Sequence, residues 1–185
     1  MWFVPSDILI SRDWGLLPDY VIEKAVVVVT GTWEGAELFD RPLAYLVANE
    51  FASREFFPIV MSDVFILEVG KRLDKFLEKK TPLISIGSRV ANALTALVAK
   101  DTNVNPDQYV GVVEWRGTVV GLAYGRDPLE TRDAVYKFLH EHLDRYIEKI
   151  KTRRLTRLTT WPRDKAATTE NSLLSKLLNE LKENT

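Results

Sequence analysis

The feature that most constrains the fold is a strand–loop–helix pattern that the chain repeats over residues 25–100. The first predicted strand, Ala25–Val29, is an apolar run without polar alternation. A strand of this kind is buried on both faces, as in the middle of a parallel sheet. Strands are predicted again over 57–61 and 82–86, and a helical period of apolar residues follows each one. Consecutive units of this type favour a parallel sheet with right-handed crossovers.

The intervening helices are placed by their capping residues. The first helix is predicted over 40–54, with Asp40 as its N-cap ahead of a proline. Two more helices are predicted over 67–79 and 89–100, and Ser88 is the expected cap of the latter.

The pattern changes in the second half of the chain. Strand-like runs over 108–115 and 118–124 are joined by Arg116-Gly117, which predicts a β-hairpin. Asp127 and Glu130 then form a capping box for a long amphipathic helix. If that helix packs on the sheet like the others, the second hairpin strand is parallel to the first three. The sequence therefore predicts an α/β three-layer, Rossmann-like sandwich of about five strands, mostly parallel with one antiparallel hairpin strand.

Length and composition set the domain organisation and exclude several classes of protein. The 185 residues fit an α/β domain over 1–150, followed by a basic linker and an amphipathic C-terminal helix over 151–185. A net charge of -1 argues against nucleic acid as a partner. The longest apolar run is far shorter than the roughly 20 residues of a membrane span, and the N-terminus does not resemble a signal peptide. The absence of cysteine fits a reducing compartment, so we expect a cytoplasmic protein without membrane contact.

Polar and small residues gather after the predicted parallel strands. Open α/β sheets bind ligands at the carboxyl ends of their strands, and helix N-termini there attract anionic groups. The sequence therefore predicts a site for a small nucleotide- or sugar-like molecule, with transfer or hydrolysis as its chemistry. Glu34 and Asp63 are the candidate acid and base. The candidate ligand-binding residues are Thr30, Gly31, Thr32, Trp33, Ser62, Gly87, Ser88, Asn92 and Arg126.

Several of these residues have an equally good structural interpretation. Thr30 and Ser88 are also what turns and helix caps require, and Gly87 is what a tight turn requires. The sequence lacks the glycine-rich phosphate loops of common nucleotide-binding proteins, so it identifies no cofactor. His140 and His142 lie two residues apart on a predicted helix and so point to different faces, which predicts no metal site.

The C-terminal segment suggests a second kind of function. Residues 149–165 are strongly basic, and leucines over 173–181 recur at the spacing of one helix face. A helix of this kind has to bury its apolar face, either on its own domain or against another subunit. The alternative hypothesis is therefore a non-catalytic interaction protein that forms homo-oligomers through residues 166–185.

Two short segments resemble the α/β domains of archaeal surface-layer proteins. In 82–92, Gly87 and Asn92 match a glycine and an asparagine that follow a strand in that pattern, while Ser88 and Arg89 depart from it. The segment from Tyr124 to Thr131 is similar to a second part of the pattern. Together the two segments cover about a tenth of the chain. The resemblance implies a Rossmann-like sandwich with a structural or unknown role.

Overall fold

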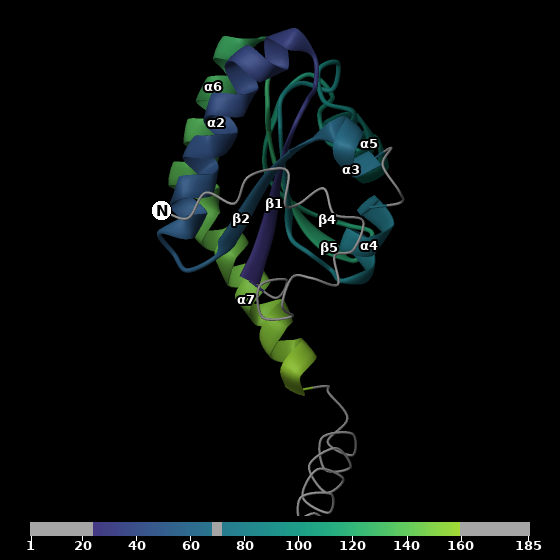
Figure 1. Ribbon diagram of the computed structural model, residues 1–185, viewed down its shortest axis with the longest axis vertical. Helices are drawn as coiled ribbons and strands as arrows, with labels where there is room; N and C mark the ends of the chain where they lie inside the picture. Colours follow the sequence, from purple (N-terminus) through teal and green to yellow (C-terminus); the bar gives the residue numbers. More distant parts are fainter. Residues whose placement is uncertain (1–23, 68–71, 160–185) are drawn as a thin grey trace, which may run out of the picture. The chain divides into compact units, whose positions relative to one another are not determined.

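The computed structural model describes residues 24–67 and 72–159 and contains the predicted mixed sheet (Figure 1). The five strands lie in the order β2-β1-β3-β5-β4. The pairs β1–β2, β1–β3 and β3–β5 are parallel, and β4–β5 is antiparallel, so the predicted α/β sandwich is confirmed. The strands are β1 (Ala25–Thr30), β2 (Phe57–Ser62), β3 (Leu83–Ile86), β4 (Tyr109–Trp115) and β5 (Thr118–Tyr124).

The hairpin between β4 and β5 forms as its turn sequence predicts. Arg116 and Gly117 both have positive φ, at 45° and 80°. Two successive left-handed residues twist a two-residue turn to match the strands that it joins. Consequently β5 runs parallel to β3, and its carboxyl end lies at the same edge of the sheet as those of β1, β2 and β3.

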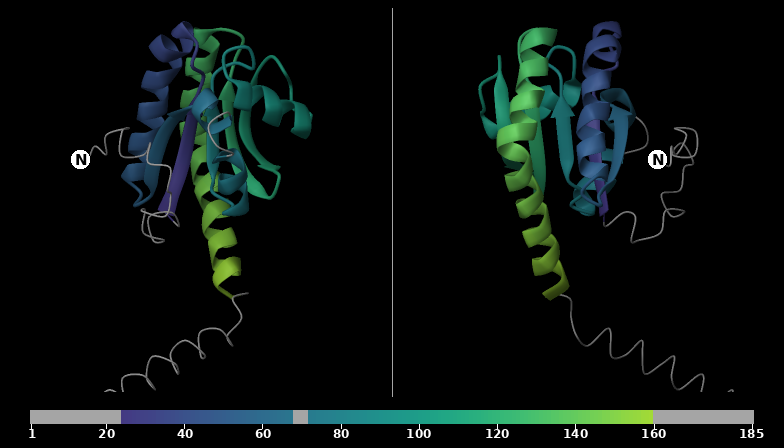
Figure 2. Two further views of the ribbon diagram at one scale, coloured as in Figure 1. Left: turned by 45° about the vertical axis from the view of Figure 1, so that its right-hand side comes forward. Right: turned by 90° about the vertical axis from the view of Figure 1, so that its left-hand side faces the viewer.

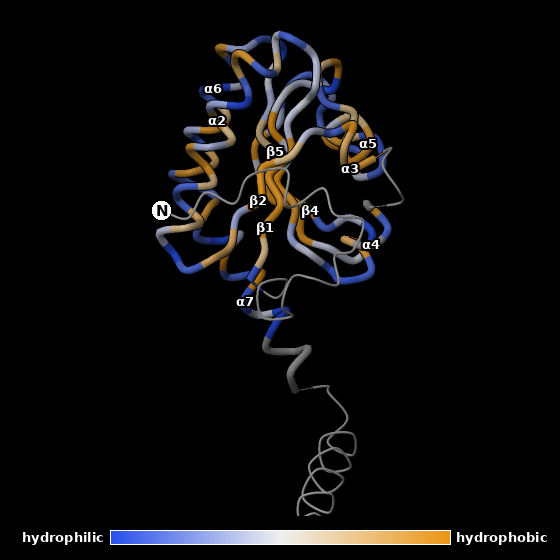
Figure 3. Tube along the Cα trace, in the orientation of Figure 1, coloured by the Kyte–Doolittle hydropathy of each residue, from blue (hydrophilic) through white to orange (hydrophobic). Residues whose placement is uncertain are grey.

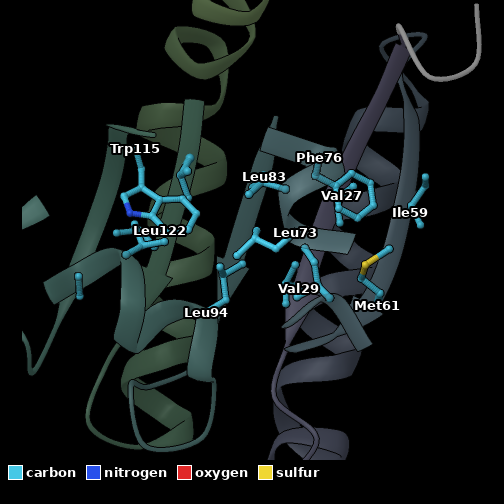
Figure 4. Close-up of a cluster of buried hydrophobic side chains, with 14 of the residues drawn as sticks. Val27, Val29, Ile59, Met61, Leu73, Phe76, Leu83, Leu94, Trp115 and Leu122 are labelled. Atoms are coloured by element: carbon cyan, nitrogen blue, oxygen red, sulfur yellow. The ribbon is translucent and has the colours of Figure 1, made fainter. Parts of the chain in front are cut away.

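Three short helices cover one face of the sheet. They are α3 (Asp63–Leu67), α4 (Arg72–Glu78) and α5 (Ala93–Thr102). The apolar side chains of these helices interdigitate with those of the central strands, as Figure 4 shows for Leu73, Leu94, Val27 and Leu122. The single helix predicted over 67–79 is instead divided into α3 and α4, and residues 68–71 between them are not described.

Longer helices cover the opposite face (Figures 1 and 2). Their rings form a second cluster, in which Phe51, Phe138 and Tyr146 meet edge to face. The hydroxyl of Tyr146 donates a hydrogen bond to the Leu83 carbonyl oxygen over 2.8 Å, which ties this layer to β3. Figure 3 shows the result as apolar strands between helices of mixed polarity. The elements of this layer are α2 (Glu34–Ala52), α6 (Pro128–Lys137), a π-helical turn η2 (Phe138–His142) and α7 (Leu143–Thr159).

Helix α2 begins six residues before its predicted start. Glu34 and Glu37 lie in its first turn, where carboxylates are stabilised by the helix dipole. Asp40 is therefore not an N-cap but an interior residue, and it is buried. Pro42 therefore does not mark the start of the helix. Burial of Ala36 and Ala44 on the sheet stabilises the helix on both sides of this proline.

The long C-terminal helical region contains an extra residue in its middle turn. Phe138 and Leu143 are both buried although they lie five residues apart, the spacing of a π-helix. The π-turn η2 keeps both side chains on the sheet, where a regular α-helix would rotate one of them away. The predicted uninterrupted amphipathic helix is therefore two α-helices joined by η2.

The chain divides into two compact units, residues 1–148 and 149–185. The predicted boundary after residue 150 falls inside α7, which continues as a helix to Thr159. The basic stretch over 149–165 is thus helical at least to that residue. The leucine-rich segment over 173–181 lies outside the described residues.

Candidate functional site at the carboxyl ends of the parallel strands

The carboxyl ends of β1, β2 and β3 meet at one edge of the sheet, because β1 is paired in parallel with both of the others. The chain leaves β1 toward β2 on one side and later enters β3 on the other. The carboxyl ends of β1 and β3 therefore flank a topological switch point, where open sheets keep their ligands. The three predicted loops, which begin after β1, β2 and β3, lie around it.

Asp63, one of the two candidate catalytic residues, holds these loops together. The Thr32 hydroxyl donates to its Oδ1 over 2.6 Å, and the Val64 N–H donates to the same oxygen over 2.8 Å. The Ala93 N–H donates to Oδ2 over 2.8 Å. The residue is only 5% exposed. Its carboxylate thus links the β1–α2 loop, the start of α3 and the start of α5.

Asn92 fills the switch point itself. Its Nδ2 donates to the carbonyl oxygens of Val29 in β1, over 3.1 Å, and of Ile86 in β3, over 2.8 Å. Its Oδ1 accepts from the N–H groups of Leu94 and Thr95 at the start of α5. These four bonds use both donors and both acceptor positions of the amide. The side chain is fully buried.

These bonds explain why α5 does not begin at the predicted residue. Asn92 is its N-cap, and the helix starts at Ala93 rather than at 89. Ser88 instead belongs to the preceding turn, where its Oγ accepts from the Ala91 N–H over 3.3 Å. One of the bonds of Asn92 goes to Val29 in β1, 63 residues away, and the sequence does not show this contact.

The two site glycines allow protein groups to approach each other closely. A Cβ at Gly31 would overlap the carbonyl oxygen of Ala91, so the two loops are in direct backbone contact. A Cβ at Gly87 would overlap the Asp40 carboxylate, and Gly87 also has a φ of +107°. Both glycines are candidate ligand-binding residues, and the absence of a side chain at each one is required by neighbouring groups of the protein itself.

Asp40 and Thr30 lie on the α2 side of this region. Asp40 is 5% exposed, and its burial raises the pKa of its carboxyl group to about 6 from an ordinary value of 3.8. The hydroxyl of Thr30, the last residue of β1, is buried, and no group of the described residues is within hydrogen-bonding distance of it. Sequence reasoning missed Asp40 as a site residue. Placing the helix start at Glu34 would have revealed a carboxylate between Ala36 and Ala44 on the buried face.

The remaining candidate residues are divided between the surface and local structure. Glu34 and Thr32 are exposed, and Trp33 is 71% exposed, with its ring against Gly35. Ser62 is half-buried, and its hydroxyl accepts from the Phe65 N–H over 3.3 Å.

Arg126 is exposed and forms an ion pair of 2.7 Å with Glu130. Glu130 also accepts from the Arg126 N–H, while its own N–H donates to the Asp127 carboxylate. Asp127 is therefore the cap of α6, as predicted. Glu130 reaches back to the N–H of Arg126 rather than to that of Asp127, so only the Asp127 half of the predicted capping box is present. Arg126 is part of this cap rather than of a group that converges with Asp63 and Asn92.

Large apolar side chains are exposed along the same edge of the sheet. One lies in or directly after each of the four loops that leave the parallel strands. The four residues are Trp33, Val64, Val90 and Leu129. Surfaces that combine exposed apolar groups with locally paired charges are typical of protein–protein contacts rather than of polar ligand sites.

Comparisons with known proteins identify no relative: no family model matches the chain, and no curated protein matches it either. Within 24–67 and 72–159, no three histidine, aspartate or glutamate side chains gather closely enough to hold a metal ion. No helix in the same ranges has both the length and the apolar character needed to cross a membrane.

Proposed function

We propose that this chain is a non-catalytic interaction protein that assembles with copies of itself. The observation that carries the proposal is the contrast at the carboxyl ends of the strands. There the polar side chains with the strongest predicted roles, Asp63 and Asn92, bond to the protein's own backbone and loops. Four apolar side chains, those of Trp33, Val64, Val90 and Leu129, remain exposed there.

A small-molecule site requires polar groups that are free to converge on the ligand. Asn92 has no such capacity left, and Asp63 accepts three hydrogen bonds from other groups. Breaking these bonds to bind a ligand would leave buried groups unpaired, at a cost of about 1–3 kcal/mol for each group. The same residues serve a structural role without any such cost. The resemblance to surface-layer domains implies a structural or unknown role for the domain as a whole.

Sedimentation velocity of the full chain over about a hundredfold range of concentration tests the proposal. Because association follows mass action, the sedimentation coefficient is expected to rise with concentration toward that of an oligomer. A single monomeric species at every concentration would contradict the proposal.

A second candidate function is binding of a nucleotide- or sugar-like molecule, with Glu34 and Asp63 as acid and base. It is supported by the buried polar side chains of Thr30 and Asp40 beside the switch point. A thermal-shift series with nucleotides and phosphosugars tests this candidate. A ligand at a hundred times its Kd stabilises a protein by about 2.7 kcal/mol, so binding would raise the melting temperature visibly. A shift that Asp40→Asn abolishes would favour the second candidate over the first.

The cytoplasmic location belongs to this proposal as well. It is supported by the absence of cysteine, which fits a reducing compartment. Fractionation of cells that express the tagged full chain tests it, and recovery with the membrane or outside the cell would contradict it.

A further inference from the structure

We infer that the outer face of helices α2 and α6 is the surface through which two copies of this chain pair. This inference rests on the proposed function and names the part of the domain that performs it. We call this surface the α2–α6 face and define it by Leu38, Tyr45, Leu129 and Tyr136.

The four residues form two matching rows. Leu38 and Tyr45 are 65% and 47% exposed and lie seven residues apart on α2. Leu129 and Tyr136 are 63% and 46% exposed and have the same spacing on α6. Seven residues are almost two helical turns, so both residues of each pair are on one side of their helix. Large apolar side chains in rows on two helices are more than the scattered exposure of an ordinary surface.

The two rows lie on neighbouring, parallel helices. Helix α2 follows β1 and α6 follows β5, so both begin at the carboxyl edge of the sheet and run back along the same face. The helices pack against each other beside the sheet (Figures 1 and 2). Each row has its leucine nearer the carboxyl edge and its tyrosine further along. The leucine and the tyrosine of both rows therefore follow each other in the same direction along the sheet.

The charges around the rows are neutralised within each helix. Glu37 and Arg41 form an ion pair on α2. Arg132 and Asp133 are paired over 3.0 Å on α6. The centre of a protein interface is poor in unpaired charges, because a charge without a partner is costly to dehydrate. This charge pattern suits an uncharged, apolar partner surface.

A second copy of the same face has that chemistry and the right geometry. A two-fold axis across the face reverses the direction of the helices, so the leucine of one copy meets the tyrosine region of the other at both ends. Helix α2 has 19 residues and is about 28 Å long, and α6 has 10 residues and is about 15 Å long. With about 10 Å of width for each helix, the face has a footprint of roughly 400 Å². This is about half of the roughly 800 Å² per partner that stable complexes bury, which suits a weak, concentration-dependent pairing.

The test compares three variants of the full chain by sedimentation velocity. Leu38→Gln combined with Tyr136→Gln removes one apolar side chain from each row and keeps good helix formers. Lys100→Gln is the control, because Lys100 is exposed on α5, which covers the opposite face of the sheet from α2 and α6. Leu174→Ser, Leu177→Ser and Leu181→Ser together interrupt the leucine pattern of the C-terminal segment. Circular dichroism melts establish that each variant is folded, and the single variant Tyr136→Gln replaces the double variant if the latter is not.

We expect the face variant to raise the dissociation constant of the dimer at least about tenfold, while the control leaves it unchanged. If the face variant associates like the natural chain, the inference is wrong. In that case, loss of association in the leucine variant would assign assembly to the C-terminal segment and leave the proposed function intact. A natural chain that is monomeric throughout would overturn both the inference and the proposed function.

Discussion

The switch point and the α2–α6 face represent opposite uses of side chains in one domain. At the switch point, polar residues are buried, and Asn92 and Asp63 donate or accept bonds in several directions. On the α2–α6 face, apolar residues are exposed and have their neighbouring charges paired. The difference teaches that the most conspicuous polar residues of this sequence stabilise the fold. The residues that we propose meet a partner are leucines and tyrosines exposed on helix surfaces.

Substitution of Asn92 at the switch point is expected to have the largest effect on stability. We expect Asn92→Ala to lower the free energy of unfolding by about 4 kcal/mol, because four buried hydrogen bonds are lost, two of them to strand carbonyls and two to the start of α5. Urea unfolding measures the effect. Asn105→Ala is the control, since that exposed side chain accepts only a local bond from the Asp107 N–H. Equal effects of the two substitutions would contradict the structural role of Asn92.

The buried carboxyl group of Asp40 is expected to make the stability of the protein depend on pH. Its pKa is raised in the folded protein to about 6, so the fold favours the protonated acid and loses stability as the pH rises from about 4 to 6. This rise in the pKa of Asp40 corresponds to a loss of about 3 kcal/mol in the free energy of unfolding at neutral pH. Asp40→Asn removes this penalty and should stabilise the protein by up to that amount at pH 8, but hardly at all at pH 4. Urea unfolding at both pH values is the measurement. A gain that does not depend on pH would show that Asp40 is not the buried acid described above.

Gly31 tests the backbone contact between the two loops of the switch point. Gly31→Ala introduces a Cβ that overlaps the Ala91 carbonyl oxygen, and we expect a loss of about 2 kcal/mol. Gly117→Ala is its control. The space around Gly117 is open, so the expected cost is the backbone strain of alanine at a positive φ of 80°. The control should cost about 1 kcal/mol, and thermal melts of both variants separate the two cases. A smaller loss for Gly31 than for Gly117 would contradict the close contact.

The smallest effect on stability is expected on the α2–α6 face. Leu38→Gln should change the free energy of unfolding by less than about 0.5 kcal/mol, because its side chain is 65% exposed and glutamine forms helices well. Urea unfolding at low protein concentration measures this without a contribution from association. A loss as large as that of Gly31→Ala would mean that Leu38 stabilises the domain itself.

Local patterns were sufficient to predict the sheet. The unbroken apolar run of β1 and the Arg116-Gly117 turn depend on short-range chemistry, and both predictions are confirmed. The parallel direction of β5 followed from the expectation that the last helix packs on the sheet like the others, and it is confirmed. The predicted Asp127 cap of that helix is present as well.

The errors arose where remote contacts determine the structure. The cap of α5 is Asn92 rather than Ser88, and the Asn92 amide is also held by Val29, which is 63 residues away in sequence. Helix α2 passes through Pro42 because its buried face packs on the sheet. The strand order places the predicted loops together. Only the tertiary structure shows that the Asp63 carboxylate accepts hydrogen bonds from two of these loops.

The central claim is that the α2–α6 face interacts with a partner while the switch point is part of the folded interior. A dilution series of amide NMR spectra of the full chain tests it most directly. The account predicts that concentration-dependent shifts are confined to residues around Leu38, Tyr45, Leu129 and Tyr136, with Gly31, Gly87 and the Asn92 side-chain amide unchanged. Shifts at those switch-point groups on adding a nucleotide or a phosphosugar, with no change along α2 and α6 on dilution, would contradict it.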